Sequence, residues 1–363
     1  LLGRIANTAV TFGDLDRAIA YVERALPLLE RLDMHEDLED AMTTKAYWMM
    51  TSGRHREAKM LFDGALDLAD EAGNQTARAD ALLMLGIVVL EDDPRMSLQR
   101  SLEGVEAARR AGVRGLEAGS MGNAAEAATD LGEWAIADEL LSDLAGRLDL
   151  PPRSHQALAL NQALLAAYRG RSADAAALLA EQASELETTD FLMARTWFLR
   201  ARASAELMAG DLDAAYTTGM EAVQTEPSGG NAPTSVWCAA RAALWLRDTE
   251  RARTARTAMD ELRGRWIENC RRAVDAGIAA LEGHLDDALA GYQRTFETWE
   301  AMDLPFDRAA CVIDAATLLP AEALPRETID GAHAYLQQLG ATPLLERLVA
   351  ATRLVTMEVG LEQ

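Results

Sequence analysis

The sequence is poor in aromatic residues and in lysine. Aromatic side chains make up 5% of the 363 residues while hydrophobic residues reach 49%, so the core must be built mainly from alanine and leucine. Lysine occurs only at Lys45 and Lys59, and the remaining strong bases are arginines, a usage typical of GC-rich bacterial genomes. No apolar run approaches the ~18 residues that a membrane span needs, so we expect no membrane segment.

Cysteine is also scarce. The three cysteines, Cys238, Cys270 and Cys311, are odd in number, far apart and set in apolar surroundings. This pattern predicts buried free thiols and a cytoplasmic protein in a reducing environment. The N-terminus has no signal-peptide pattern, and it begins at Leu1, without methionine, inside a helical repeat, so we expect a piece of a longer protein.

The motifs that carry chemistry are missing as well. There is no glycine-rich phosphate loop, no nucleophile elbow, and no histidine with a second ligand at metal-binding spacing. The acidic pairs Asp92-Asp93 and Asp286-Asp287 stand where helices begin, which indicates capping. The net charge of −23 argues against non-specific binding of nucleic acid or of anionic lipid. We therefore expect no catalytic residue, no metal, no cofactor and no enzyme activity in this segment.

What the chain does have is a repeat. A small residue recurs eight times at a spacing of 36 to 40 positions, at Ala18, Ala58, Ser97, Ala137, Ala175, Ala215, Ala252 and Ala288. Five positions before each stands a turn residue: Gly13, Gly53, Asp92, Gly132, Gly170, Gly210, Arg247 and Gly283. Repetition at this period is typical of a stack of supersecondary units, each in contact with its neighbours.

The sequence of each unit predicts a helical hairpin. In the first, residues 2–12 form a helix that ends at Gly13, and a second helix over residues 15–32 carries Ala18 on its inner side. The small residue lets the second helix approach the first closely. Two irregular stretches, residues 149–154 and 225–234, predict loops between hairpins.

After the eighth unit the period fades, and helices are expected over residues 308–319, 327–339 and 342–353. The predicted fold is all-α: a right-handed α-α superhelix of about eight helical hairpins, closed by a C-terminal capping helix pair. We assign residues 1–305 to the repeat superhelix, 306–353 to the capping helices and 354–363 to a tail.

The short helix, the glycine turn and a second helix that begins with alanine resemble the tetratricopeptide repeat (TPR). The units are longer than the usual 34 residues, and the usual Trp and Gly of the first helix are mostly replaced by Ala. The long, alanine-rich form looks like the helical region of large bacterial signalling ATPases, namely maltose-regulator-type transcription activators and ATPase-linked nucleotide cyclases. The likeness rests on two connections between repeats, residues 71–74 and 111–113, and on the C-terminal segment that closes the array, residues 339–347. It implies a sensor or interaction arm that controls domains located elsewhere.

A candidate binding surface follows from the same resemblance, which places first helices on the concave face. The inward positions of the sixth and seventh units are Trp197, Arg200, Trp237, Arg241 and Trp245. In other units the inward positions are Tyr47, Met50, Glu126, Asp130 and Tyr168. Tryptophan and arginine are enriched at binding hot spots, so one hypothesis is a groove for an acidic peptide.

Three other interpretations stay open. The tryptophans could serve only to pack neighbouring repeats together. The groove could instead hold a small-molecule effector such as a sugar. The convex face could act as an oligomerisation surface.

Overall fold

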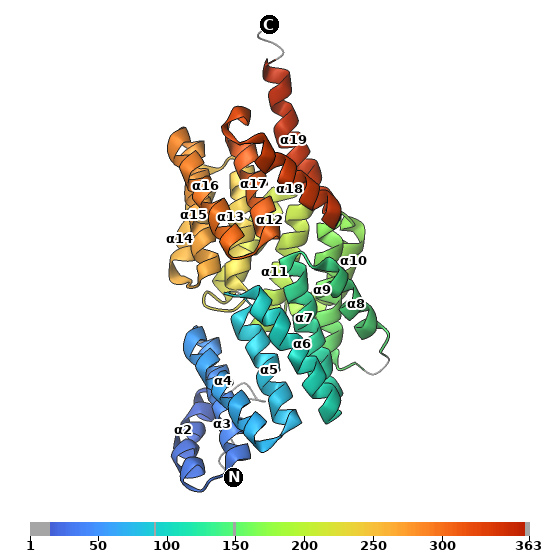
Figure 1. Cartoon of the computed structure of the whole chain (residues 1–363), viewed down its shortest axis with the longest axis vertical. Coiled ribbons are helices and arrows are strands. Elements are labelled where there is room, and N and C mark those ends of the chain that lie inside the picture. The colour runs from blue at the N-terminus through green and yellow to red at the C-terminus, as the bar shows by residue number, and fades with distance from the viewer. Residues whose placement is uncertain (1–14, 91, 148–149, 360–363) are drawn as a thin grey trace. The chain divides into compact units, whose positions relative to one another are not determined.

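The structure, a computed structural model, describes residues 15–90, 92–147 and 150–359, and within these ranges the regular structure is helical, with no strand (Figure 1). The chain divides into two compact units. Unit 1 comprises residues 1–128 and 136–158, and unit 2 comprises residues 129–135 and 159–363. The division of the sequence at residues 305 and 353 is a different one and stays a prediction.

The helices alternate between the first and second member of each hairpin. Mainly in unit 1 are α2 (Leu15–Arg31), α3 (His35–Thr51), α4 (His55–Ala72), α5 (Gln75–Val89), α6 (Pro94–Ala111), α7 (Arg114–Leu131) and α8 (Trp134–Ala145). Mainly in unit 2 are α9 (Pro152–Tyr168), α10 (Ser172–Leu186), α11 (Leu192–Ala209), α12 (Leu212–Thr225), α13 (Ala232–Trp245), α14 (Thr249–Ala258), α15 (Arg265–Leu281), α16 (Leu285–Ala301), α17 (Pro305–Leu318), α18 (Arg326–Leu339) and α19 (Thr342–Val359).

The hairpins turn at the predicted glycines. The backbone angle φ is positive at each of them in the described part of the chain: 74° at Gly53, 79° at Gly132, 78° at Gly170, 83° at Gly210 and 85° at Gly283. Glycine reaches this left-handed region without a Cβ penalty, which is why a helix can end there and reverse. Gly13 and the helix expected over residues 2–12 lie outside the described residues.

The two hairpins without a glycine turn use other devices. In the third, the carboxylate of Asp93 accepts a hydrogen bond from the backbone N–H of Met96 at 3.0 Å, and Pro94 starts α6. In the seventh, Arg247 itself adopts a φ of 58°, and Asp248 caps α14 by accepting from the N–H of Arg251 at 3.0 Å. An arginine in the left-handed region is strained relative to glycine, so this turn is held by its surroundings.

The recurring small residues lie where the sequence analysis placed them. All eight are buried, with exposed fractions of 1% or less: Ala18, Ala58, Ser97, Ala137, Ala175, Ala215, Ala252 and Ala288. Ser97 also donates a hydrogen bond to the carbonyl oxygen of Gly86 at 2.7 Å, across the hairpin from α6 to α5. The burial of these small residues agrees with the predicted close packing in the hairpins of which the structure describes both helices, from the second to the eighth.

Helix ends differ from the predictions mainly at prolines. The loop expected over residues 149–154 is shorter because α9 already begins at Pro152, and α17 begins at Pro305 rather than at residue 308. Proline suits a first helical position, where its missing N–H has no intrahelical partner to lose. At the other end, α19 continues past the predicted end at residue 353 to Val359, with no glycine or proline to stop it.

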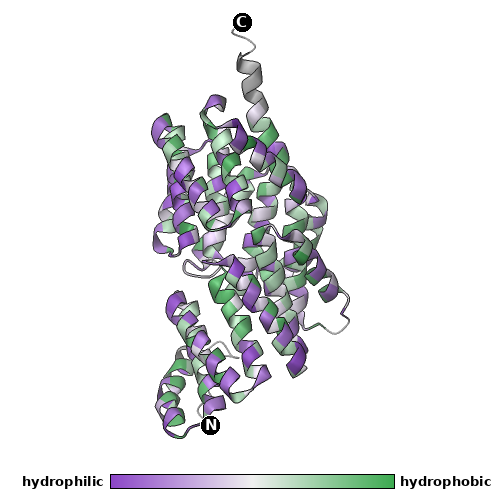
Figure 2. Ribbon diagram, viewed as in Figure 1, coloured by the Kyte–Doolittle hydropathy of each residue, from purple (hydrophilic) through white to green (hydrophobic). Residues whose placement is uncertain are grey.

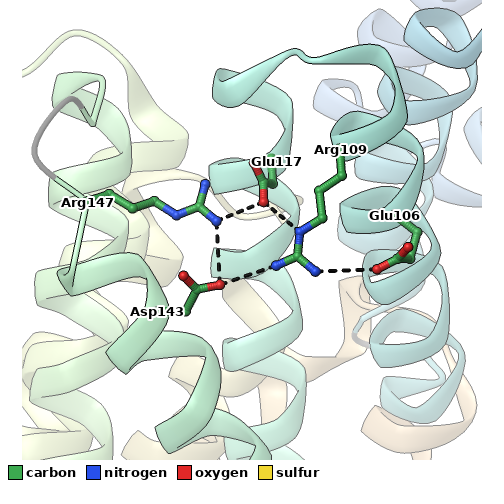
Figure 3. Close-up of polar contacts among 5 residues, drawn as sticks. All are labelled: Glu106, Arg109, Glu117, Asp143 and Arg147. Atoms are coloured by element: carbon green, nitrogen blue, oxygen red, sulfur yellow. Dashed lines mark hydrogen bonds and ion pairs between the residues drawn. The ribbon is translucent and has the colours of Figure 1, made fainter.

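In unit 1, a polar network joins three successive helices (Figure 3). Glu117 of α7 accepts from Arg109 Nε of α6 at 2.7 Å and from Arg147 Nη2, which follows α8, at 2.8 Å. Asp143 of α8 lies 3.2 Å from Arg109 Nη2, and Glu106 of α6 forms the outer end of the network. Only 12% of the Glu117 side chain is exposed, so both guanidiniums hold a nearly buried carboxylate.

We expect Glu117→Gln to lower the free energy of unfolding of the full chain by about 1–2 kcal/mol at pH 7. Hydrogen bonds from Arg147 and Arg109 lower the pKa of Glu117 to about 2, from 4.5 in the unfolded chain. The stabilisation is therefore fully present above pH 4.5 and disappears as the pH falls through 2. Urea denaturation at pH 7 and at pH 3 measures it. The matched control is Glu106→Gln at the exposed end of the network; an equal loss in both variants would contradict the prediction.

Unit 2 has an aromatic core that includes the turn between α7 and α8. The Trp134 ring stacks on Tyr168 with centroids 5.9 Å apart and meets Phe306 of α17 edge-on at 5.9 Å. A Cβ at Gly132 would collide with Tyr335 of α18. These contacts explain why residues 129–135 belong to unit 2, together with the C-terminal helices. In Figure 2, hydrophobic and hydrophilic residues alternate along the helices.

Candidate binding site

The predicted Trp/Arg cluster lies in unit 2, on α11 and α13. Trp197 is half-buried and packs against the core beside Phe198 and Leu199. Trp237 and Trp245 of α13 are 4% and 7% exposed. The five residues therefore divide into Trp197, at the edge, and four side chains enclosed by protein.

Arg200 pairs with a residue of an earlier hairpin. Its Nη2 atom donates to both carboxylate oxygens of Asp130, at 2.7 and 2.9 Å. The Arg200 side chain is 2% exposed, and Asp130 is 21% exposed. The bond spans 70 positions of sequence and fixes the end of α7 to α11.

Arg241 pairs with Asp314 of α17. Its Nε atom lies 3.0 and 3.1 Å from the two oxygens of Asp314, and Trp245 Nε1 donates to Asp314 Oδ1 at 2.8 Å. The guanidinium carbon sits 4.4 Å from the ring centroid of Trp237, within the range of a cation–π contact. Burial alone would lower the pKa of Arg241, but the Asp314 carboxylate outweighs it and raises the pKa. Burial raises the pKa of Asp314, whereas the donors Arg241 Nε and Trp245 Nε1 on its carboxylate favour the ionised form.

Helix α19 covers the same cluster from the other side. The guanidinium carbon of Arg347 lies 3.8 Å from the centroid of the Trp245 ring. Burial lowers the pKa of Arg347 to about 10, with Arg241 adding to the decrease and Asp314 opposing it. Arg241 and Trp245 thus meet an acidic side chain, but it belongs to the chain's own α17.

The sequence analysis did not identify Asp314 or Arg347 as partners of the cluster. A signal was present: Asp314 is the one charged residue within the apolar run 309–319 of its helix. A carboxylate buried in this way must find a cation or a donor. The sequence does not show which arginine pairs with the Asp314 carboxylate, because Arg241 lies 73 positions away. The role of Trp197, Arg200, Trp237, Arg241 and Trp245 in binding a partner stays a prediction.

A second group of ionisable residues lies in unit 1, on the first helices α3 and α5. Glu39 is 5% exposed, and its Oε1 accepts from Thr43 Oγ1 at 3.1 Å. Burial raises the pKa of Glu39 to about 7, and the charges of Asp40 and Asp80 add to the increase. Burial and the charge of Asp40 raise the pKa of Asp80 to about 6. We call Glu39, Asp40 and Asp80 the α3/α5 acidic surface.

Two further classes of site are absent from the described ranges. No three His, Cys, Asp or Glu side chains there come together in a way that could hold a metal ion. Nor does any described helix combine the length and apolar character that crossing a bilayer requires. The cysteines are buried free thiols, as predicted.

Comparison with solved structures supports the fold. No family model matches the sequence, and neither does any curated protein. Among solved structures, a monomeric mutant of IFIT1 with m7Gppp-AAAA is similar, with a TM-score of 0.51 and 14% identity, covering 97% of this chain and 80% of that chain. The yeast Tom70 crystal structure has a TM-score of 0.35 and 11% identity, covering 98% and 95%. Both are TPR-like helical-repeat proteins. The similarity to IFIT1 and the hairpins described above confirm the predicted class: the chain is an all-α array of TPR-like repeats.

Proposed function

We propose that this chain is a non-enzymatic, protein-binding scaffold that acts as the sensor or interaction arm of a multidomain bacterial signalling protein, a transcription regulator or a nucleotide cyclase. The signalling context rests on the sequence resemblance at the connections between repeats and at the C-terminal segment that closes the array. The binding role is supported by the hairpin array, which presents consecutive first helices side by side, as in helix-in-groove and peptide recognition.

The α3/α5 acidic surface is the observation that carries the proposal. In unit 2, α17 packs against α13 and α19 packs against α11. In unit 1, Asp40 is exposed and Asp80 is half-buried. No ion pair among the described residues involves Asp40 or Asp80. Uncompensated, partly buried carboxylates with raised pKa values favour a partner that brings positive charge.

Apolar side chains adjoin this surface. Tyr47 of α3 and Met84 and Ile87 of α5 are partly buried and pack against the core of unit 1. A partner segment with lysine or arginine next to an apolar residue would match both features. We therefore take a basic segment of another protein as the ligand of this surface.

The proposal is tested with a fluorescently labelled, lysine-rich peptide and anisotropy measurements on the full chain. Asp40→Asn/Asp80→Asn is expected to weaken binding about ten-fold, which corresponds to ~1.4 kcal/mol. Binding should also weaken as the pH falls from 8 to 5, because Glu39 and Asp80 take up protons. The control, Asp67→Asn/Glu71→Gln, removes two exposed charges from the second helix α4. Equal loss in both variants, or affinity independent of pH, would rule out this surface.

The alternative function is a small effector held at Trp237, Arg241 and Trp245, and it requires a change in the structure of unit 2. Asp314 already accepts from Nε of the Arg241 guanidinium and from the Trp245 indole N–H, two donors that such a ligand would use. A ligand there must displace α17, so this alternative requires unit 2 to open.

A further inference from the structure

A groove lies between α10 and α11 in unit 2, away from both surfaces discussed above. It has a volume of about 350 Å³ and continues to the start of α12. Its lining includes Ala176, Leu179 and Ala180 of α10 and Phe198 and Arg202 of α11. Its volume is at the lower end of the range for ligand sites, enough for a few side chains.

The floor of the groove is apolar, and its walls are formed mainly by small side chains. Leu179 and Phe198, which are 7% and 1% exposed, form part of the core below it. Five of the lining residues are alanines, and Ala176 and Ala180 of α10 are exposed. Alanine walls let the backbone of a third helix approach closely, as the recurring alanines do within each hairpin of this chain.

The rim of the groove is acidic. Three carboxylates, Glu187, Glu206 and Asp211, face one guanidinium, Arg202. Arg202 is already neutralised, with Nε at 2.9 Å from Glu206 and Nη1 at 3.1 Å from Glu187. Because three carboxylates and one guanidinium line the groove, its rim keeps an excess of negative charge.

The acidic residues stand at the two ends of an elongated strip. Asp211, the N-cap of α12, lies at the end where α10 begins, and Glu187 directly follows the last residue of α10. The 15 residues of α10 extend about 22 Å, the length of about four helical turns. An apolar strip of this length with a carboxylate at each end matches a helix that is apolar along one side and basic near its ends.

We propose that the α10/α11 groove docks a cationic amphipathic helix of a partner protein. Small apolar side chains of this helix fill the space above Leu179 and Phe198, and its lysines or arginines pair with Asp211 and Glu187. The groove is a second contact of the scaffold. It does not depend on the α3/α5 acidic surface, with which it shares no residue.

The test uses two synthetic helices of about 18 residues, long enough to cover the groove. Both carry the same alanine and leucine stripe; one has lysines toward its ends and the other glutamates. Binding to the full chain is measured by fluorescence anisotropy in the Asp40→Asn/Asp80→Asn background, so that the α3/α5 acidic surface cannot account for it. The lysine helix should bind at least about ten-fold more tightly than the glutamate helix.

A matched pair of variants locates the site. Ala180→Trp fills the groove and should weaken binding of the lysine helix at least about ten-fold. Ala177→Trp, on an exposed position of the same helix that does not line the groove, should leave it within about two-fold. No binding, equal binding of the two helices, or equal effects of the two tryptophans would overturn the proposal. Self-association of the wild-type chain that Ala180→Trp abolishes, seen by analytical ultracentrifugation, would also overturn it, in favour of a second copy as the occupant.

Discussion

Asp314→Ala is expected to lower the free energy of unfolding by about 3–5 kcal/mol. The substitution leaves Arg241 charged, 8% exposed, and without the carboxylate that both its Nε contacts reach. It also removes the acceptor of the Trp245 indole N–H. A buried unpaired charge is among the most costly defects a folded chain can carry, which is why the loss exceeds that of any surface pair in this protein.

The measurement is urea denaturation followed by tryptophan fluorescence, because Trp237, Trp245 and Trp266 belong to the same unit. The double variant Arg241→Met/Asp314→Leu is the control, since it removes both charges and keeps apolar volume. We expect it to recover most of the stability that Asp314→Ala loses, as replacing a whole buried pair is often nearly neutral. A loss of less than ~1 kcal/mol in Asp314→Ala would mean that the pair is not ionised in the folded chain.

Ala175→Leu is expected to destabilise the chain by about 1–3 kcal/mol, or more if α10 cannot shift. Ala175 is fully buried where α10 packs against the preceding helix of its hairpin, and the added atoms have no free space to enter. Leucine is nearly as good a helix former as alanine, so the effect reports on packing rather than on helix propensity.

Ala177→Leu is the matched control for this prediction. It stands two residues further along α10, on an exposed position, and should change the free energy of unfolding by no more than ~0.5 kcal/mol. Thermal and urea denaturation of both variants give the comparison. Similar values for the two would show that the recurring small residues do not govern the approach of paired helices.

The two units of the array differ in how their inner helices are used. In unit 2, Arg200 and Arg241 find their carboxylates within the same unit, at Asp130 and Asp314. In unit 1, the carboxylates of Asp40 and Asp80 lie on first helices without such a partner among the described residues. In the proposed function, the paired charges hold the shape of unit 2, and the uncompensated ones attract another molecule.

The sequence by itself determined the hairpins. The turn at Gly210 and the burial of Ala215 depend on residues at most a few positions apart, because a helix repeats every 3.6 residues and a left-handed turn is a property of one residue. The same reasoning gave the cap of α6 at Asp93 and the free thiols. For these features the local pattern and the tertiary structure agree, and no long-range information is needed.

The partners of the Trp/Arg cluster were decided only by the tertiary structure. Sequence reasoning placed Arg241 beside Trp237 and Trp245 and predicted that it favours an acidic group, and the structure supplies that group from Asp314, 73 positions later. Which helix returns to which depends on small rotations between successive hairpins that accumulate along the array. A change of a few degrees per repeat would bring a different residue to Arg241, and no local pattern in the sequence encodes that sum.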